Sequence, residues 1–420
     1  MSKISKLLNN PKLFFKDMIL NLIRKKYNIE ENLPIEENLP IEENLPIEEN
    51  LPIEENLPNV LCRYPIVLHT GEKGENALSH ISMWYLYFKK SEVNFIIIVR
   101  CPKALKLVQD RYPEASVVYL KDKKEVDIFF NTFSSIKACF YPSNTGNNFH
   151  LFYQTHIKHI FIGHGDSDKS SSAHKFFRVY DENWVAGEAH IDRMLNANFN
   201  LNGLKHVKIG RPNLLDILKK SKLDWRDRFE GKINLLYLPT WEGFCAEQAY
   251  SSLDIVLQNI KKLQDNSSFQ KINISIKLHP LSGKKEKKFL NLEHLLSKEK
   301  EIRVISKYDS LHEYIIKSNM FICDISAVVS ECLAANAPIF LYIPKDKNIK
   351  IAQSNMPYEE YCYIFSSPEE LSELVYRVVS GDDFLWQNRL KAQKYIINTE
   401  DTLKETFIKQ LQEISEDNSV

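Results

Sequence analysis

The chain lacks three features that would narrow its function at once: net charge, paired cysteines and long apolar runs. Its 55 Lys and Arg residues are balanced by 55 Asp and Glu residues, which argues against a general nucleic-acid binder that neutralises many phosphates. The 7 cysteines show no C-x-x-C spacing and follow no secretory signal, so we expect reduced thiols in the cytosol. No apolar run reaches the roughly 18 residues of a membrane span, so we expect no transmembrane helix.

The chain does contain enough apolar material for a large core. Apolar residues make up 44% of the 420 residues, and 23 Phe and 19 Tyr are among them. Such a composition excludes a chain that is disordered throughout. The length suits two domains of roughly 150–200 residues each better than one compact core.

Residues 1–28 are strongly basic, with seven Lys and Arg residues against one acidic residue, Asp17. From Pro11 onward, apolar residues recur at helical spacing: Phe14, Phe15, Met18, Ile19, Leu22 and Ile23. This combination predicts a helix that lies on an anionic membrane surface. The alternative is an amphipathic helix that docks on the protein's own core.

Residues 29–58 are dominated by the six-residue repeat Asn-Leu-Pro-Ile-Glu-Glu, which occurs four times between Asn32 and Glu55. A proline at every sixth position forbids a continuous helix, and the repeated glutamates repel one another. The unit is also far shorter than a solenoid repeat of about 20–50 residues. We interpret the segment as an extended linker, and the alternative is a tract without function.

After residue 58, short apolar runs alternate with amphipathic helical stretches. Predicted strands fall at residues 66–68, 95–99, 116–120, 138–141, 159–162, 182–185, 234–237, 273–277, 303–305, 320–323 and 338–342. This pattern predicts an α/β protein with two parallel sheets, each wound like a nucleotide-binding fold. We assign an N-terminal domain to residues 59–222 and a C-terminal domain with terminal helices to residues 223–420. A ligand would bind in the cleft between the carboxyl ends of the two sheets.

A histidine and a lysine follow one strand of the N-terminal domain. His164 comes directly after an apolar run and lies between Gly163 and Gly165, so its ring would project from a strand end and accept a proton near neutral pH. The alternative is a turn histidine without a function. Lys169 lies in a serine-rich stretch that either binds a phosphate or is a solvated loop.

Further candidates follow two strands of the C-terminal domain. His279 ends one strand and is held in an extended conformation by Pro280, so it would face His164 across the cleft. Ser326 is placed as a helix N-cap, where free backbone N–H groups would bind a diphosphate. Glu331, about one turn into that helix, either bonds ribose hydroxyls or is a surface charge.

These residues belong to motifs that recur in a fixed order. The motifs are Gly163-His164-Gly165 with Lys169, Gly210-Arg211-Pro212, Tyr237-Leu238-Pro239-Thr240-Trp241, Lys277-Leu278-His279-Pro280, and Asp324-Ile325-Ser326 through Glu331 to Pro338. The ordered set resembles the CDP-glycerol glycerophosphotransferase family over about residues 155–380. That family comprises teichoic-acid primases and polymerases and their capsule-assembly relatives.

The resemblance implies a GT-B fold, with two Rossmann-type domains facing across a cleft, and a specific reaction. A phosphopolyol would pass from a CDP-linked donor to a hydroxyl of a lipid-linked or glycan acceptor at the inner membrane face. The family's His-Gly pair falls on His164-Gly165, its lysine on Lys169 and its His-Pro pair on His279-Pro280. The N-terminal domain would bind the acceptor and the C-terminal domain the donor.

Two departures from the family pattern favour a capsule or surface-glycan branch over a wall teichoic acid polymerase. The family's Asp-Tyr-Ser-Ser motif falls on Asp324-Ile325-Ser326-Ala327, which lacks the aromatic residue and the second serine. Asp166 and Ser167 replace the Thr and Pro that follow the family's His-Gly pair.

The resemblance also implies a role for each matched residue. His164 would be the general base. His279, the second catalytic residue, would neutralise the charge of the diphosphate together with Lys169 and the helix N-terminus at Ser326. Lys169, Thr240 and Ser326 would bind the diphosphate, Glu331 the ribose, and Gly165, Asp324 and Arg211 would complete the motifs. No cofactor is implied. No metal is expected either, because Asp166 and Asp168 lack partners at a known ligand spacing.

Two other functions fit the same sequence. A GT-B glycosyltransferase would use a similar diphosphate site but a nucleotide sugar as donor. A non-catalytic subunit bound to the membrane and to capsule machinery would need no base at His164. The expected partners are therefore a CDP-linked polyol, an acceptor and an anionic membrane surface, but no nucleic acid.

Overall fold

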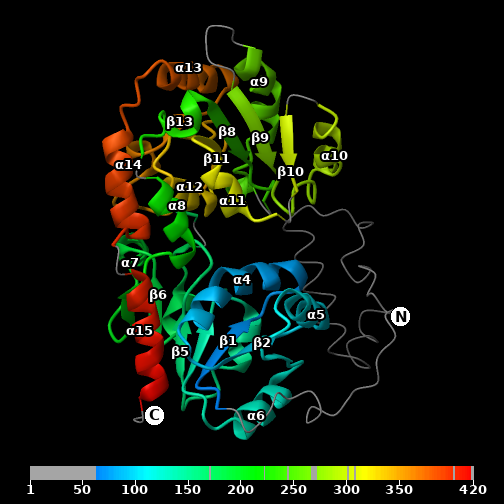
Figure 1. Ribbon diagram of the computed structural model, residues 1–420, viewed down its shortest axis with the longest axis vertical. Coiled ribbons are helices and arrows are strands. Elements are labelled where there is room, and N and C mark those ends of the chain that lie inside the picture. The colour runs from blue at the N-terminus through cyan, green and yellow to red at the C-terminus, as the bar shows by residue number, and fades with distance from the viewer. Residues whose placement is uncertain are drawn as a thin grey trace, which may run out of the picture. The chain divides into compact units, whose positions relative to one another are not determined.

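The computed structural model describes residues 63–169, 172–221, 223–243, 246–265, 272–299, 302–306, 309–400 and 403–417. The predicted basic segment 1–28 and the predicted linker 29–58 lie outside these residues. Residues Leu57–Val420 form one compact unit. Its described part contains two parallel β-sheets flanked by helices (Figure 1).

The first sheet has seven parallel strands in the spatial order β3-β2-β1-β4-β5-β6-β7. Their bounds are β1 Ile66–Thr70, β2 Phe95–Val99, β3 Val117–Tyr119, β4 Ala138–Tyr141, β5 Lys158–Phe161, β6 Glu182–Val185 and β7 Lys205–Lys208. Alternate residues of β1 enter different cores, with Ile66 and Leu68 on one face and Val67 on the other. Both faces of this sheet are therefore buried, which explains its nearly continuous apolar strands.

Helices cover both faces of the first sheet. They are α4 Gly74–Lys90, α5 Pro102–Arg111, α6 Lys123–Thr132 and α7 Glu188–Asn196. Helix α8 Leu215–Lys220 follows them in the chain, but its Ile217 is buried in the core of the second sheet. The start of α5 is set by Pro102 in its first turn and by the Cys101 Sγ, which accepts a hydrogen bond from the Ala104 N–H. The side chain of Asp122 caps α6 through the Glu125 N–H.

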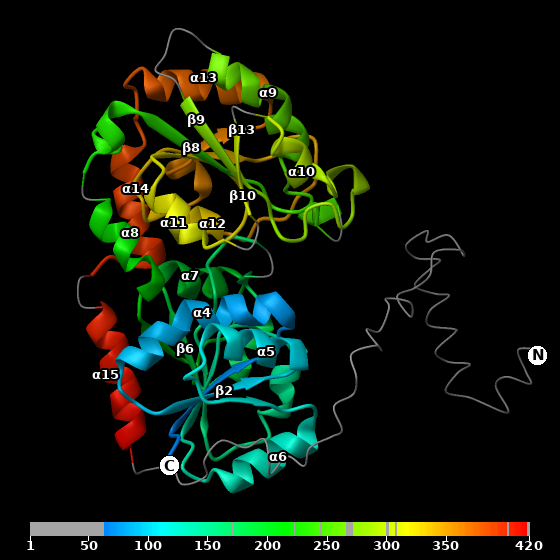
Figure 2. The ribbon, with the colours of Figure 1, turned by 45° about the vertical axis from the view of Figure 1, so that its right-hand side comes forward.

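The second sheet has six parallel strands in the order β10-β9-β8-β11-β12-β13. Their bounds are β8 Ile233–Leu238, β9 Ile272–Lys277, β10 Ile302–Ile305, β11 Met320–Asp324, β12 Ile339–Tyr342 and β13 Tyr363–Phe365. Its helices are α9 Leu253–Asp265, α10 Leu292–Leu296, α11 Leu311–Ile316, α12 Val328–Leu333, α13 Pro368–Val379 and α14 Trp386–Ala392. Helices α9 and α13 lie together on one side of this sheet (Figure 2).

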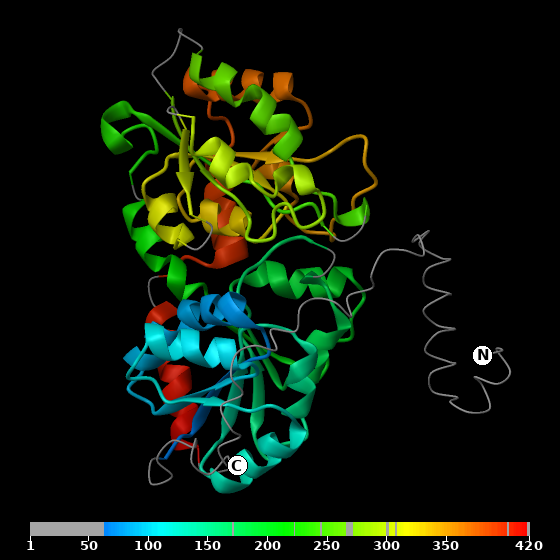
Figure 3. The ribbon, with the colours of Figure 1, turned by 90° about the vertical axis from the view of Figure 1, so that its right-hand side faces the viewer.

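The last helix, α15 Leu403–Glu416, returns to the first sheet. Its Phe407 and Leu411 are fully buried in the core that also contains Trp84 and Phe88 of α4. Figure 3 shows α15, in red, alongside the blue and cyan elements of the first half. The segment predicted for the C-terminal domain thus ends on the N-terminal sheet, and the domain boundaries stay a prediction.

The predicted α/β class with two parallel sheets is confirmed, and each of the predicted strands coincides with an observed strand. Two strands were not predicted: β7 is an edge strand with exposed lysines at both ends, and β13 has only 3 residues. None of the described helices is both long and apolar enough to cross a membrane.

Candidate active site

The loop after β5 lies against the segment between β11 and α12. Gly163 adopts a left-handed φ of +64°, and a Cβ added to Gly165 would lie only 2.6 Å from the Cβ of Ala327. Glycine at position 165 therefore permits a close approach that any side chain would block. This approach brings residues 164–169 of the first half to the loops of the second sheet.

His164 is held in one tautomer by a backbone hydrogen bond. Its Nδ1 lies 2.8 Å from the carbonyl oxygen of Pro142, and because a carbonyl only accepts, Nδ1 carries the proton. The lone pair of Nε2 is then available. The ring keeps an exposed surface, but the surrounding protein removes enough water to lower its pKa, so the imidazole is neutral at pH 7. These are the properties of a general base.

A second histidine that the sequence analysis missed lies on His164. The ring of His80, from α4, stacks on it with centroids 4.0 Å apart and an angle of 14° between the planes. Burial and the neighbouring His164 lower the pKa of His80 well below its usual value. A lone histidine in a helix carries no signal that distinguishes this position from an ordinary core position.

His279 is held in the opposite tautomer. Its Nδ1 accepts a hydrogen bond of 3.1 Å from the Leu281 N–H, so the neutral ring carries its proton on Nε2. Burial, with Lys169 and then Lys277 nearby, lowers its pKa to about 4. At neutral pH His279 is therefore an uncharged hydrogen-bond donor. The expectation that it supplies positive charge to a diphosphate is therefore wrong.

Lys169 carries the only formal charge among His164, His279 and Lys169. Its ammonium group lies 5.4 Å from the centroid of the Tyr250 ring. Burial lowers its pKa, whereas the nearby Asp324 raises it. Since the same lysine also acts on the pKa of His279, residues from both halves of the protein meet at one place.

Asp324 anchors the loops at the carboxyl edge of the second sheet. Its Oδ2 accepts hydrogen bonds from the N–H groups of Thr240, at 2.7 Å, and Ser252, at 3.2 Å. Burial raises its pKa to about 7, although Lys169 opposes this change. Among the described residues, neither Oδ1 of Asp324 nor Oγ1 of Thr240 has a hydrogen-bond partner. Buried polar atoms of this kind are usually satisfied, so they are available to a ligand.

The structure corrects the prediction that Ser326 caps a helix. The N-cap of α12 is Ala327, and the Ser326 hydroxyl instead donates to the backbone oxygen of Asp324 at 3.2 Å. The helix has only 6 residues, so its dipole is small. Ser326 does not cap the helix because its hydroxyl forms a hydrogen bond within the turn after Asp324.

Glu331 lies inside α12 and is paired with a residue that the sequence analysis missed. Its carboxylate is 3.2 Å from Nε2 of His312 in α11. Burial lowers the pKa of His312, but the hydrogen bond and charge of Glu331 outweigh this and raise it. Glu331 also raises the pKa of His164, so it lies near the base. Nothing in the spacing of the sequence joins position 312 to position 331.

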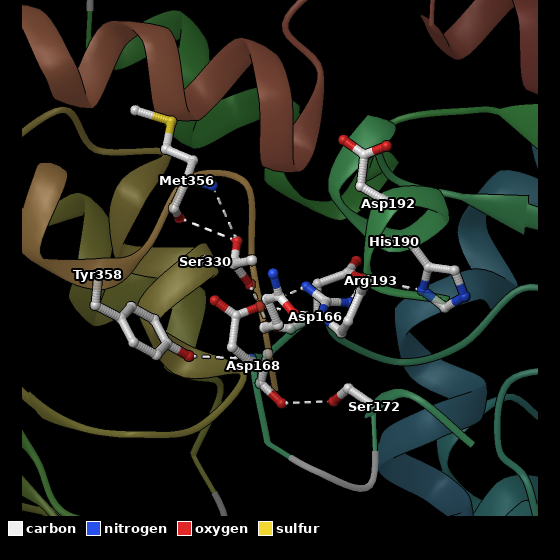
Figure 4. Close-up of polar contacts among 12 residues, drawn as sticks. Asp166, Asp168, Ser172, His190, Asp192, Arg193, Ser330, Met356 and Tyr358 are labelled. Carbon is white, nitrogen blue, oxygen red and sulfur yellow. Dashed lines mark hydrogen bonds and ion pairs between the residues drawn. The ribbon is translucent and has the colours of Figure 1, made fainter. Parts of the chain in front are cut away.

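A buried ion-pair network holds the loop that carries His164 (Figure 4). The Arg211 guanidinium donates to Oδ2 of Asp166 and, at 3.1 Å, to the Ile162 oxygen. Arg193 pairs with Asp168 at 2.8 Å. Burial favours a neutral Asp166, but Arg211 and further cationic neighbours lower its pKa below the usual range. The carboxylates of Asp166 and Asp168 are thus occupied by arginines.

The same loop is joined to the second half by three hydrogen bonds. The Ser330 hydroxyl donates to the backbone oxygen of Asp166 at 3.0 Å, and the Asp168 N–H donates to the Tyr358 hydroxyl at 3.0 Å. The Ala352 N–H donates to the backbone oxygen of Asp168 at 2.7 Å. Arg211 therefore fixes a loop that is itself joined to the second half, through its buried ion pair with Asp166.

Replacing Asp166 with alanine should lower the free energy of unfolding by about 3–5 kcal/mol, because removing one partner leaves buried arginine charge uncompensated. Urea denaturation measures the change. Asp110→Ala, at an exposed position of α5, is the matched control and should change stability by no more than about 0.5 kcal/mol. Equal losses in the two variants would contradict a structural role of the network.

Comparison with known proteins adds evidence of a different kind. The family model of CDP-glycerol:poly(glycerophosphate) glycerophosphotransferase matches residues 145–401. No curated protein sequence matches the chain.

Several solved structures share the fold. The wall teichoic acid polymerase TagF is 16% identical, with a TM-score of 0.56 and coverage of 99% of both chains. A TagF variant soaked with CDPG is 14% identical, with a TM-score of 0.55, covering 86% of this chain and 90% of that chain. The S. aureus protein MnaA with UDP is 12% identical, with a TM-score of 0.54, covering 83% and 96%. At these low identities the structural likeness shows a GT-B-like fold and nothing more. The family match is made with the chain's own sequence and therefore shows the family.

Proposed function

Because the chain belongs to the CDP-glycerol:poly(glycerophosphate) glycerophosphotransferase family, we propose that it transfers a phosphopolyol from a CDP-linked donor to an acceptor hydroxyl, with His164 as the general base. The acceptor is a lipid-linked or glycan component of the cell envelope. The assignment of these residues rests on one observation, that the two histidines are held in opposite tautomers. Nε2 is unprotonated in His164 and protonated in His279.

The reaction follows from these two tautomers. Nε2 of His164 takes the proton of the acceptor hydroxyl, and the oxygen attacks the phosphorus that bears the polyol. A new P–O bond forms, the bond to the bridging oxygen of the diphosphate breaks, and CMP leaves. Phosphoryl transfer depends mainly on positioning and on stabilising charge. Nε2–H of His279 and the ammonium group of Lys169 supply this stabilisation at the diphosphate.

Unsatisfied polar atoms at or after the carboxyl ends of β8, β9 and β11 support a donor site on the second sheet. Thr240 Oγ1, Asp324 Oδ1, Glu242 Oε2 and Ser282 Oγ are all buried without a partner among the described residues. A CDP-linked donor offers many hydroxyl, phosphate and amine groups to such atoms. Ser326 belongs to this site through its place in the turn after Asp324, and not as a helix cap.

The decisive experiment incubates the full-length protein with CDP-glycerol and a polyol acceptor. Release of CMP together with a new phosphodiester supports the proposal. Release of a nucleoside diphosphate from a nucleotide sugar would instead identify a glycosyltransferase. Turnover that does not depend on His164 would leave the base unassigned, and no turnover with either donor class would favour a non-catalytic subunit.

Glu331 is proposed to bind the ribose of the donor. Glu331→Ala should raise the donor KM by about 5- to 100-fold, since an unpaired sugar hydroxyl costs about 1–3 kcal/mol. Steady-state kinetics with each substrate varied in turn make this measurement. Glu293→Ala, on α10, serves as the control. A donor KM and a kcat that both stay at the wild-type value would remove Glu331 from the site.

The basic segment 1–28 is proposed to hold the enzyme on the inner face of the cell membrane. Its charge provides roughly 1 kcal/mol per basic residue near an anionic surface. Deleting residues 1–58 should abolish sedimentation with anionic vesicles but leave turnover of a short soluble acceptor. Shortening the repeat from four copies to two should preserve vesicle binding. If the deleted form still sediments with vesicles, the basic run at residues 284–288 becomes the candidate.

A further inference from the structure

One edge of the proposed base is fixed by a hydrogen bond, but that bond does not set the plane of the ring. Among the described residues, the side chain of His164 makes one hydrogen bond, from Nδ1 to the Pro142 oxygen at 2.8 Å. The last torsion of a histidine side chain has broad preferences, and this side chain is exposed. A general base must keep its acceptor nitrogen within reach of the attacking hydroxyl, so the ring needs a second contact.

The ring of His80 in α4 supplies that second contact. It lies on the ring of His164 with centroids 4.0 Å apart and planes inclined by 14°. Parallel rings at this distance are in van der Waals contact, so rotation of one ring about its Cβ–Cγ bond would bring it into the other. The stack covers one face of His164 and sets its plane, while Pro142 fixes its Nδ1 edge.

Helix α4 also holds the surroundings of the base at two further points. Trp84, about one turn after His80 in the helix, donates from Nε1 to the Gly163 oxygen at 2.8 Å. Tyr87, about one turn further, donates from its hydroxyl to the Pro212 oxygen. Residues at this spacing lie on one face of an α-helix. One face of α4 therefore contacts the base, the residue before it and the loop that contains Arg211.

The ring of His80 is uncharged, which suits a neighbour of the base. Burial, and then the nearby His164, lower the pKa of His80 well below its ordinary value. When His164 accepts a proton from the acceptor, its own ring becomes positive. A second positive charge about 4 Å away would oppose that step, whereas an uncharged ring does not. His80 can therefore hold the base without hindering its protonation.

We propose that His80 is a positioning residue of the reaction, which holds the ring of His164 in the plane from which Nε2 takes the acceptor proton. This inference rests on the proposed function and adds a residue to it. Helix α4 lies outside residues 145–401, so the family match assigns no role to His80. The role follows instead from the ring contact and from the face of α4 that carries it.

The kinetic test compares three replacements of His80 in the full-length protein, with CDP-glycerol and a polyol acceptor. His80→Ala and His80→Leu remove the flat ring and should lower kcat about 10- to 100-fold, the usual effect of displacing a catalytic group by about 1 Å. His80→Phe should keep the wild-type kcat, because it restores a flat ring and because Nδ1 of His80 has no partner to lose among the described residues. The donor KM should not change, because His80 acts on the base and not on the diphosphate.

The matched control is Ser79→Ala, the exposed neighbour of His80 in α4, which should keep the wild-type kcat. If His80→Ala does not fold, His80→Leu carries the comparison, since it keeps an apolar side chain of similar size. Wild-type kcat in the variants without a ring would overturn the proposal. A loss in His80→Phe as large as in His80→Leu would also overturn it, because a flat ring would then not be the feature that matters.

The pH profile is a readout that a purely structural residue would not move. Removing the His80 ring admits water to His164, and burial is the main cause of the low pKa of His164. The acid limb of kcat/KM should therefore move up toward pH 6.5 in His80→Ala and stay in place in His80→Phe. The charges that face His164 remain in both variants: Arg211 lowers its pKa, and Glu331 and Asp166 raise it. An acid limb that does not move in His80→Ala would contradict the proposal.

NMR titration of the His164 ring separates this proposal from the proposed function. The ring signals, assigned with His164→Gln, report its pKa without any turnover. A pKa that rises in His80→Ala but not in His80→Phe, in a protein that releases no CMP, would show that His80 holds His164 and would refute the transferase assignment. CMP release at the same rate in the wild type, His80→Ala and His80→Leu, with an unchanged titration, would refute the role of His80 alone.

Discussion

Replacing His164 with alanine should lower the rate of CMP release by about 10²- to 10⁴-fold, the usual contribution of a general base. The fold should survive, because the side chain makes one backbone hydrogen bond and keeps an exposed surface. Thermal melting and circular dichroism check the fold, and single-turnover kinetics with acceptor in excess measure the rate. His156→Ala, an exposed histidine of the same half, should leave the rate unchanged.

The pH profile gives an independent readout of the same assignment. A base acts only when it is unprotonated, and burial lowers the pKa of His164 from its ordinary value of 6.5. The acid limb of kcat/KM should therefore lie below pH 6.5, with full activity above it. His164→Ala should lose this limb along with the rate. A variant that keeps near wild-type turnover, or the wild-type acid limb, would rule out His164 as the base.

Much of the fold could be predicted because its strands are buried on both faces. Continuous apolar runs such as those at β2 and β11 are visible without any tertiary information. Edge strand β7 was missed because Lys205 and Lys208 are exposed and interrupt the apolar signal. The packing of α15 on the first sheet was missed because an amphipathic pattern shows that a helix has a buried face, but not which surface covers it.

Some residues of the candidate site could likewise be predicted from the sequence, and others could not. His164 and His279 could be found because each follows an apolar strand, where side chains of parallel sheets converge. His80 and His312 could not be found, since their importance depends on contacts between helices that are distant in the sequence. The charge of His279 was misjudged as well. Its low pKa comes from burial beside Lys169, and neither burial nor that neighbour can be read from the sequence.

Lys169→Met should produce the second large effect, a fall of about 10²- to 10³-fold in kcat/KM for the donor. This is the range for removing one preorganised group that stabilises charge in a transition state. Of His164, His279 and Lys169, which act in the proposed reaction, only Lys169 is formally charged, so neither neutral histidine compensates for its loss. Lys175→Met, an exposed lysine shortly after it in the chain, is the matched control and should retain the wild-type value.

A titration of His279 tests the position of Lys169 without relying on activity. The positive charge of Lys169 helps to lower the pKa of His279 to about 4, so removing that charge should raise it toward its ordinary value. The same substitution should raise the pKa of Asp324 above about 7, because Lys169 stabilises its ionised form. NMR titration of the His279 ring, assigned with His279→Gln, reports the first change. Unchanged titration of His279, together with an unchanged donor KM, would show that Lys169 does not act at the diphosphate.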